Sequence, residues 1–482
     1  MSAGRPNVVV FVPDQLRADA VGAFGNPYVQ TPNIDRLAAR GARCANAFVQ
    51  HPVCSPSRAS FLTGWYPHVS GHRTLTHLLR ADEPNFLKTF RDNGYHVTWV
   101  GERGDTFAPG GTEASVDEYG FAVAPTGMRW AADIEYENDL AARTFYAGRV
   151  EDAVDFDEAA VRTAETWLAG APREPWLLFV PLLAPHVPFK AAEPWYSMYD
   201  RDVMPDPVPP SDGLEPSFYQ PIRDAYGLER ATPEHWREIT ATYYGMVSRM
   251  DDHLGRILDA VERSGHADDT ITAFFADHGE YLGDYGLIEK WPTSMTANIT
   301  RDPLILAGPG IPGGEVVEDM VELIDVFPTL LDLCEVPDDT HRHFGRSLVP
   351  RLRGEDVPHR EYAFTEGGFT LEEAAQLERP GYPYDRKGDL QHADPRLVGK
   401  ATAVRDRSWT YVHRLYDGPE LYDRVADPDE RINIAGRPEF AQIEERMRAE
   451  LLRRLIETAD VVPFARDPRR PEVDLPAPGA ER

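Results

Sequence analysis

Cysteine, lysine and long apolar runs are all scarce in this chain of 482 residues. Its three cysteines are too few for a disulfide framework, and we interpret Cys44 and Cys334 as packed, unreactive thiols. The longest apolar run, residues 176–184, is too short to cross a bilayer. No charged and then apolar leader precedes the first apolar segment. We therefore expect a soluble, cytoplasmic protein.

Basic residues are outnumbered, since 50 lysines and arginines face 79 aspartates and glutamates, which gives a formal net charge of −29. This charge disfavours nucleic acid and anionic membranes as partners. It also repels small anions at long range, so any anion site must be locally basic. Only five lysines occur in the chain: Lys88, Lys190, Lys290, Lys387 and Lys400. The position of each is therefore informative.

Apolar runs bounded by turn residues alternate with helical patterns up to about residue 345. The runs are continuous rather than alternating, as in strands that are covered on both faces. They occupy residues 7–12, 96–100, 176–183, 270–276 and 303–306. Helical patterns lie between them, notably at 32–40, 84–93 and 234–264. The alternation predicts a large α/β domain over residues 1–350, with a central, mostly parallel sheet flanked by helices.

The pattern changes beyond residue 350. Short strand-like runs joined by turns occupy residues 361–364, 400–404, 408–413 and 420–422, and a strongly charged helix is predicted at 439–458. We predict a smaller C-terminal α+β domain over residues 351–462 with an antiparallel sheet. A tail rich in proline, arginine and aspartate follows at 463–482, and we expect it to be flexible.

Two local features concern the long helices. Thr31 and Pro32 stand at the N-cap and first helical positions of one predicted helix, which Gly41 closes. Asp251 and Asp252 look like a metal pair in isolation. Side chains at consecutive helical positions diverge by about 100°, so we favour capping or structural hydrogen bonding for this pair.

Residues 52–64 read Pro-Val-Cys-Ser-Pro-Ser-Arg-Ala-Ser-Phe-Leu-Thr-Gly. The segment resembles the signature of the sulfatase family, in which the cysteine becomes formylglycine, and it matches at every fixed position from Pro52 to Gly64. The alternative for Cys54 is a small, buried core cysteine. The resemblance implies that Cys54 is converted to an aldehyde by a formylglycine-generating maturation enzyme. One hydroxyl of its hydrate would attack sulfur and the other would expel sulfate, through a covalent sulfo-enzyme.

Acceptor groups follow two of the predicted strands directly. Asp14 and Gln15 come after the first strand, and Asp277 and His278 come after the run 270–276. The carboxyl ends of parallel strands are the edge at which open α/β sheets place ligands. Two carboxylates, an amide oxygen and a hydrated aldehyde at Cys54 would supply the oxygen-rich shell that a hard divalent cation requires. Taken singly, each aspartate could also be only a strand-end cap.

The resemblance to sulfatases extends over this wider set, from about residue 7 to 435. Asp14-Gln15 and Asp277-His278 resemble the two metal pairs of the family, in the variants found in choline-sulfatase-like members and in phosphonate monoester hydrolases of the alkaline phosphatase superfamily. The resemblance implies a divalent metal held by Asp14, Gln15, Cys54, Asp277 and His278. Calcium is the expected ion, with magnesium or manganese as alternatives because His278 softens the site.

Two further motifs complete the likeness. Residues 184–188 resemble the family's Pro-His-x-Pro loop, which implies that His186 contacts the ester or protonates the leaving oxygen. Lys290 matches the sulfate-binding lysine of the family, although a solvated loop lysine is the alternative. Residues 420–423 and 427–430 resemble a C-terminal element of the family. The implied catalytic residues are thus Cys54, Arg58, His186, Lys290 and Asp277, with Asp277 as the base.

One position departs from the family pattern. Glu102 stands where a lysine is expected, and no histidine follows nearby. A carboxylate beside a sulfate would be repulsive by several kcal/mol at short range in a poorly hydrated pocket. Either Arg103 supplies the missing cation, or His72, Arg73 or His77 does so. A third possibility is that the site does not bind sulfate in the usual way.

The resemblance implies an enzyme that hydrolyses the sulfate monoester of a small molecule. The first alternative keeps the nucleophile and changes the substrate to a phosphonate monoester or phosphodiester. The second, from a different class, is a catalytically silent binding protein with this fold, which Glu102 would favour. We expect specificity to be determined by loops such as 106–137 and 188–232, in which no motif identifies the substrate.

Overall fold

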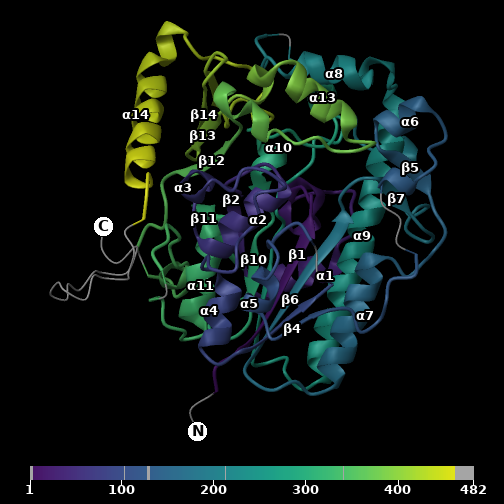
Figure 1. Cartoon of the computed structure of the whole chain (residues 1–482), viewed down its shortest axis with the longest axis vertical. Helices are drawn as coiled ribbons and strands as arrows, with labels where there is room; N and C mark the ends of the chain where they lie inside the picture. Colours follow the sequence, from purple (N-terminus) through teal and green to yellow (C-terminus); the bar gives the residue numbers. More distant parts are fainter. Residues whose placement is uncertain are drawn as a thin grey trace, which may run out of the picture.

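The computed structural model describes residues 4–101, 104–127, 131–211, 213–339, 341–355 and 357–461. A central sheet lies between two groups of helices, and a smaller sheet with one long helix stands beside it (Figure 1). The predicted tail at 463–482 lies outside the described residues, and so do Glu102 and Arg103. Among the described helices, none is both long and apolar enough to span a membrane.

The central sheet has nine strands in the order β11-β2-β10-β8-β1-β6-β3-β4, with β9 paired to β2. The strands are β1 (Asn7–Asp14), β2 (Ala42–Phe48), β3 (His96–Val100), β4 (Glu118–Gly120), β6 (Trp176–Pro185), β8 (Thr270–Phe274), β9 (Arg301–Asp302), β10 (Ile305–Ala307) and β11 (Glu315–Glu322). Neighbours pair in parallel except β10, which is antiparallel to β8 and β2, and β9. The predicted mostly parallel sheet is confirmed.

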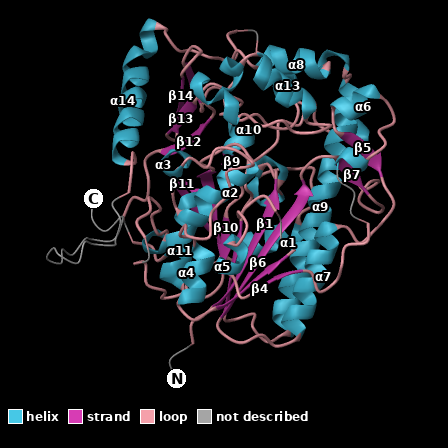
Figure 2. Ribbon diagram, viewed as in Figure 1, coloured by secondary structure: helices cyan, strands magenta, loops and turns pink. Residues whose placement is uncertain are grey.

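Both faces of the sheet are buried, which explains the continuous apolar runs. Val9 and Phe11 of β1 pack in one core with α1 (Pro32–Arg40), α7 (Phe156–Ala169) and α9 (Pro233–Arg263). Val8 and Val10 point to the opposite face, toward α2 (Cys54–Thr63), α4 (Phe86–Asp92) and α11 (Val326–Leu333). Figure 2 shows the strands between these two groups of helices. Because alternate residues of a strand face opposite sides, both sets must be apolar.

Hydrogen bonds join the start of α1 to α9. Thr31 occupies the N-cap position as predicted, but its side chain makes no capping hydrogen bond there. The carboxylate of Asp251 on α9 accepts hydrogen bonds from the main-chain N–H groups of Asn33 and Ile34 instead, at 3.0 and 2.7 Å. The N–H groups of a first helical turn have no partner within the helix, and Asp251 supplies one for these two. The structural interpretation of Asp251 is therefore confirmed.

The C-terminal part contains a four-stranded antiparallel sheet in the order β12-β13-β14-β15. Its strands are β12 (Ala363–Gly367), β13 (Ala401–Arg405), β14 (Trp409–Arg414) and β15 (Glu420–Asp423), and α14 (Ala441–Glu457) packs on it. This agrees with the predicted smaller α+β unit. Tyr66 and Ile324 of the larger part share a core with this sheet, and the division at residue 350 stays a prediction.

Shorter α-helices and one further strand pair lie between these elements along the chain. They are α3 (Pro67–Ser70), α5 (Gly111–Ser115), α6 (Asp139–Arg143), α8 (Tyr219–Tyr226), α10 (Ala297–Thr300), α12 (Val349–Leu352) and α13 (Asp385–Ala393), with the strand pair β5 (Tyr146–Arg149) and β7 (Phe189–Ala191). Of these, α13 bears most on function, because it carries residues of the C-terminal part to the site described below.

His68 fastens α3 to the C-terminal part, and it makes the stability of this contact depend on pH. Its Nδ1 lies 2.7 Å from a carboxylate oxygen of Glu366 and its Nε2 lies 2.8 Å from the carbonyl of Thr458. A neutral ring has one N–H and can donate to only one of these acceptors. Although burial alone would lower the pKa of His68, the contacts with Glu366 and Thr458 raise it above its ordinary value.

Folding therefore favours the protonated form of His68. Its contribution to the free energy of unfolding is present below pH 6.5, the ordinary value, and is lost as the pH rises through the higher folded-state pKa. We expect the stability difference between the wild type and His68→Asn, measured by urea unfolding from pH 5.5 to 8.5, to shrink as the pH rises. A difference that stays constant or grows with pH would contradict this account.

Candidate active site and metal centre

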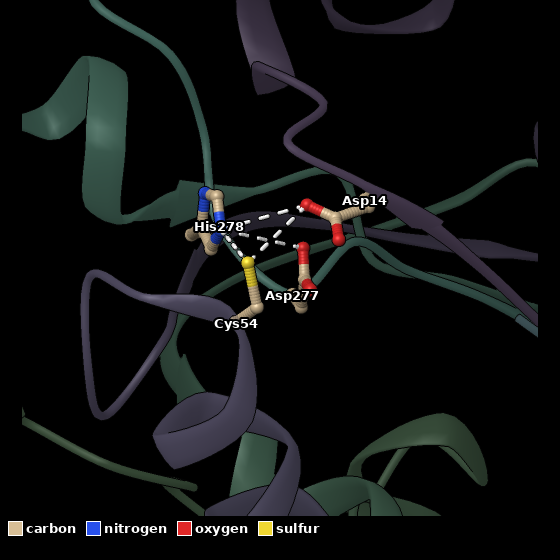
Figure 3. Close-up of side chains that lie close together, drawn as sticks. All are labelled: Asp14, Cys54, Asp277 and His278. Carbon is tan, nitrogen blue, oxygen red and sulfur yellow. Dashed lines mark hydrogen bonds and ion pairs between the residues drawn. The ribbon is translucent and has the colours of Figure 1, made fainter. Parts of the chain in front are cut away.

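Four side chains converge at the carboxyl edge of the central sheet (Figure 3). Asp14 is the last residue of β1, and Asp277 and His278 follow β8 after two buried residues. Cys54 is the first residue of α2, which begins over the same edge. Because β1 and β8 are adjacent and parallel, their carboxyl ends bring Asp14 close to Asp277 and His278. All four side chains are buried.

The distances define a compact cluster. The Sγ atom of Cys54 lies 3.1 Å from Nε2 of His278 and 3.6 Å from Oδ1 of Asp14. One ligand atom from each of Asp14, Cys54, Asp277 and His278 lies within 4.8 Å of all the others. Two carboxylates and an imidazole that face one point are a donor set that binds divalent metals. The residues present therefore fit a divalent ion.

His278 presents a lone pair to this cluster. Its Nδ1 lies 2.8 Å from the carbonyl of Gly279, which fixes the N–H on that nitrogen and leaves Nε2 as the acceptor. Burial lowers the pKa of His278 to about 4, against the opposing charge of Asp277. The ring is thus neutral at neutral pH, as a metal-binding imidazole must be.

Arg58 orients both carboxylates. It lies one turn after Cys54 on α2, so the two side chains share a helix face. Its guanidinium donates to Oδ2 of Asp277 at 2.9 and 3.0 Å and to Oδ2 of Asp14 at 3.1 Å. Burial alone would lower the pKa of Arg58, but Asp105, Asp277 and Asp14 raise it. Each Oδ2 is thereby held, and each Oδ1 faces the cluster.

Gln15 lies beside the cluster and connects it to Lys290. Its main-chain N–H donates to Oδ1 of Asp277 at 3.0 Å, and its backbone is in the left-handed region with φ 66°. For a non-glycine residue this conformation costs about 1–2 kcal/mol. Its side-chain Nε2 donates to Glu280, and its Oε1 accepts from Nζ of Lys290 at 2.6 Å. Its role as a metal ligand stays a proposal.

Lys290 and His186 lie at the same cavity and contact each other. Nζ of Lys290 is 2.9 Å from Nε2 of His186, whose Nδ1 faces the carbonyl of Val187 at 2.7 Å. Burial alone would lower the pKa of Lys290, but the acidic groups of Cys54 and Asp14 raise it. A charged ammonium beside the cluster provides the locally basic anion site that the negative chain requires.

The cluster opens into a cavity of about 1340 Å³ that is lined by Cys54, His186 and Lys290. The predicted specificity loops contribute residues 131–135, Pro188 and Lys190. The sequence reasoning missed other wall residues: Asp157, Arg249, Glu289, Tyr384 and Lys387. No sequence motif marks them. The scarcity of lysine is the one signal that could have drawn attention to Lys387.

Three of the four suggested substitutes for the missing cation lie among the described residues, and these three do not line the cavity. His72 is buried against Glu83, with Nε2 3.0 Å from the carboxylate. Arg73 pairs with Glu373, and His77 is exposed. None of these three described residues lines the cavity. Arg103 lies outside the described residues, as does Glu102.

Comparisons with known proteins agree with this geometry. The family model described as Sulfatase matches residues 6–336. The chain is 29% identical to a multifunctional alkaline phosphatase superfamily protein, PehA, of Trinickia caryophylli, over 91% of this chain and 93% of that protein. It is 26% identical to a choline-sulfatase of Rhizobium meliloti, over 91% and 84% of the two chains.

A solved structure is similar over almost the whole fold. The crystal structure of a phosphonate monoester hydrolase of Agrobacterium radiobacter superimposes with a TM-score of 0.74 at 25% identity. The match covers 94% of this chain and 96% of that one. It therefore includes both the central sheet and the C-terminal part.

Proposed function

Because the chain belongs to the sulfatase family, we propose that it hydrolyses the sulfate monoester of a small molecule, with Cys54 converted to formylglycine. Membership makes the chain a hydrolase of the alkaline phosphatase superfamily. The observation that carries the proposal is the position of Cys54, which opens α2 with its Sγ within reach of Asp14 and His278.

The unmodified thiol would be a poor nucleophile at this position. Burial raises the pKa of Cys54, and the nearby carboxylate of Asp14 raises it further. Since the thiolate is the reactive form, the thiol would be unreactive at neutral pH. The proposal therefore assigns the nucleophile to the hydrate of a converted Cys54 and not to the thiol. The hydrated aldehyde then supplies two hydroxyls on one carbon, one to attack sulfur and one to let sulfate leave.

The proposed metal is calcium, with magnesium and manganese as alternatives. Asp14, Gln15, Asp277, His278 and the oxygen of modified Cys54 would hold it. A bound divalent ion supplies positive charge that stabilises charge on the transferring group. The Oδ1 atoms of Asp14 and Asp277 already face the common point, while Arg58 holds their Oδ2 atoms.

The proposal assigns the remaining roles from contacts within the site. Asp277 accepts the proton of the attacking hydroxyl in this proposal, through the Oδ1 atom that faces His278 at 3.8 Å. The ammonium of Lys290 binds an oxygen of the ester, with Arg58 adding positive charge behind the carboxylates. In the neutral ring of His186 the N–H is on Nδ1, which faces the carbonyl of Val187, and Nε2 accepts from Nζ of Lys290 at 2.9 Å. In this proposal His186 takes up a second proton at Nε2 from water and delivers that proton to the leaving oxygen.

A second candidate function is hydrolysis of a phosphonate monoester or phosphodiester by the same site. The similarity to the Agrobacterium radiobacter enzyme over 94% of the chain favours it. We expect kcat/KM for 4-nitrophenyl sulfate to exceed that for 4-nitrophenyl phenylphosphonate and bis(4-nitrophenyl) phosphate by about tenfold or more, a difference of 1.4 kcal/mol. Each substrate carries one negative charge, so the comparison isolates the transferred group.

The reverse order would support the second function. Protein with a converted Cys54 could also hydrolyse none of these three substrates. That result would support the remaining alternative, a catalytically silent binding protein.

A further inference from the structure

A third lysine reaches the cavity from the C-terminal part of the chain. Lys387 lies in the first turn of α13, one turn after Tyr384, and both side chains line the cavity. Lys190 and Lys290 line it as well, so three of the five lysines of the chain gather at one site. Carboxylates line the same cavity, so the positive charge that an anion meets there depends on how these groups pair.

Glu289 stands between two of these lysines. It is 1% exposed, and its Oε1 lies 2.8 Å from Nζ of Lys290. Its Oε2 contacts Nζ of Lys387, which also donates to the carbonyl of Lys290. One buried carboxylate therefore bridges two ammonium groups, and only Lys290 of the two contacts Gln15 and His186.

This bridge determines how much positive charge an anion meets. The carboxylate of Glu289 alone would offset the charge of Lys290, because opposite unit charges in contact largely cancel toward a third. With Lys387 included, the group of Lys290, Glu289 and Lys387 carries a net charge of +1. Without Lys387 the net charge is zero, and the carboxylate is left beside the place where an anionic ester must bind.

We propose that Lys387 is a positioning residue that neutralises Glu289 and thereby keeps the charge of Lys290 available to an anionic substrate. The inference rests on the proposed function for the identity of that substrate. It also explains how the site gains positive charge although Glu102 stands at the position where the family has a lysine. The charge comes from α13, far along the chain.

The two partners stabilise each other's charged form. Burial lowers the pKa of Lys387 to about 7, and the carboxylate of Glu280 opposes this shift. A carboxylate in direct contact favours the ammonium further. Glu289 supplies that contact, so the ion pair favours the charged form of each partner.

Three variants test the charge-balancing role: Lys387→Gln, Lys387→Arg and the double variant Glu289→Gln/Lys387→Gln. The probes are inorganic sulfate, titrated into the metal-loaded protein by calorimetry, and kcat/KM for 4-nitrophenyl sulfate. We expect Lys387→Gln to weaken sulfate binding and lower kcat/KM by about tenfold or more, within the range of coupling between contacting charges. Lys387→Arg keeps the charge and retains most of both.

The double variant is decisive, because removing the carboxylate restores the net charge of +1. We expect it to recover sulfate affinity to within about threefold of the wild type, whereas a merely structural loss would persist or deepen. Lys88→Gln, which removes a surface ammonium paired with Asp92 on α4, is the matched control and leaves both measurements unchanged.

The inference would be overturned if Lys387→Gln bound sulfate as tightly as the wild type, or if the double variant bound it as weakly as Lys387→Gln. It would also be overturned if the wild type did not bind sulfate. Failure of the proposed function gives a different pattern. In that case no protein turns over the aryl sulfate, yet sulfate affinity still falls in Lys387→Gln and returns in the double variant.

Discussion

Replacing Cys54 with alanine is expected to abolish hydrolysis of sulfate esters, with kcat falling on the order of 10⁴-fold or more, as when other enzymes lose their nucleophile. No other described side chain in the cluster can supply a hydroxyl to attack sulfur, because Asp14, Asp277 and His278 face it as acceptors. The variant should fold, since the change removes one buried sulfur atom and costs at most about 1–3 kcal/mol.

Cys44→Ala is the matched control for this variant. Cys44 lies on β2, is 1% exposed and packs in the core on the α2 side of the sheet, outside the cluster. It should lose a similar amount of stability and keep full activity. Cys54→Ala with kcat within tenfold of the wild type would rule out a nucleophile at this position.

Replacing Asp14 with asparagine is expected to empty the metal site. The variant keeps the volume of the side chain but removes a negative charge from the cluster and from the ion pair with Arg58, which is 3.1 Å long. Because the loss of an outer-shell partner already costs 10–100-fold in metal affinity, we expect about 100-fold or more here. Inductively coupled plasma mass spectrometry measures the metal bound per chain. We expect this metal content and kcat/KM to fall together.

Asp302→Asn serves as the control for Asp14→Asn. Asp302 is a buried carboxylate on β9 that accepts a hydrogen bond from the main chain of Ala276 at 3.0 Å and is not part of the cluster. It should retain the metal. Chelation of the wild type should reproduce the Asp14→Asn defect, and added calcium should reverse it. Unchanged metal content in Asp14→Asn would remove Asp14 from the ligand set.

Much of the fold follows from periodicity because both faces of the central sheet are covered. The runs at 7–12 and 270–276 became β1 and β8, since only a strand buried on two sides is apolar at every position. The strands β2 and β11 were missed. Residues 42–48 and 315–322 mix polar and apolar side chains, and several positions of both strands are only partly buried.

The cluster could be predicted because its residues lie within short motifs at strand ends. Asp14 and Asp277 directly follow apolar runs, and Cys54 stands in an extended signature, so the shared edge of the sheet brings them together. The ion pair of Arg58 with both carboxylates depends on where α2 docks over that edge. The sequence alone contains no measure of that position.

The far wall of the cavity could not be predicted. Lys387 and Tyr384 reach it only because α13 packs back over the central domain, about 100 residues after Lys290. The contact between Lys387 and Glu289 has no periodic or motif signature. Tertiary packing alone determines which of the few lysines becomes part of the site.

The central claim is the conversion of Cys54, and mass spectrometry of the tryptic peptide 44–58 tests it most directly. The protein should be produced in its native host or together with a formylglycine-generating enzyme. The peptide also contains Cys44, which serves as an internal thiol reference. We expect Cys54 to show the mass loss of a thiol replaced by an aldehyde while Cys44 stays alkylatable. Two alkylatable thiols in this peptide would contradict the proposed mechanism.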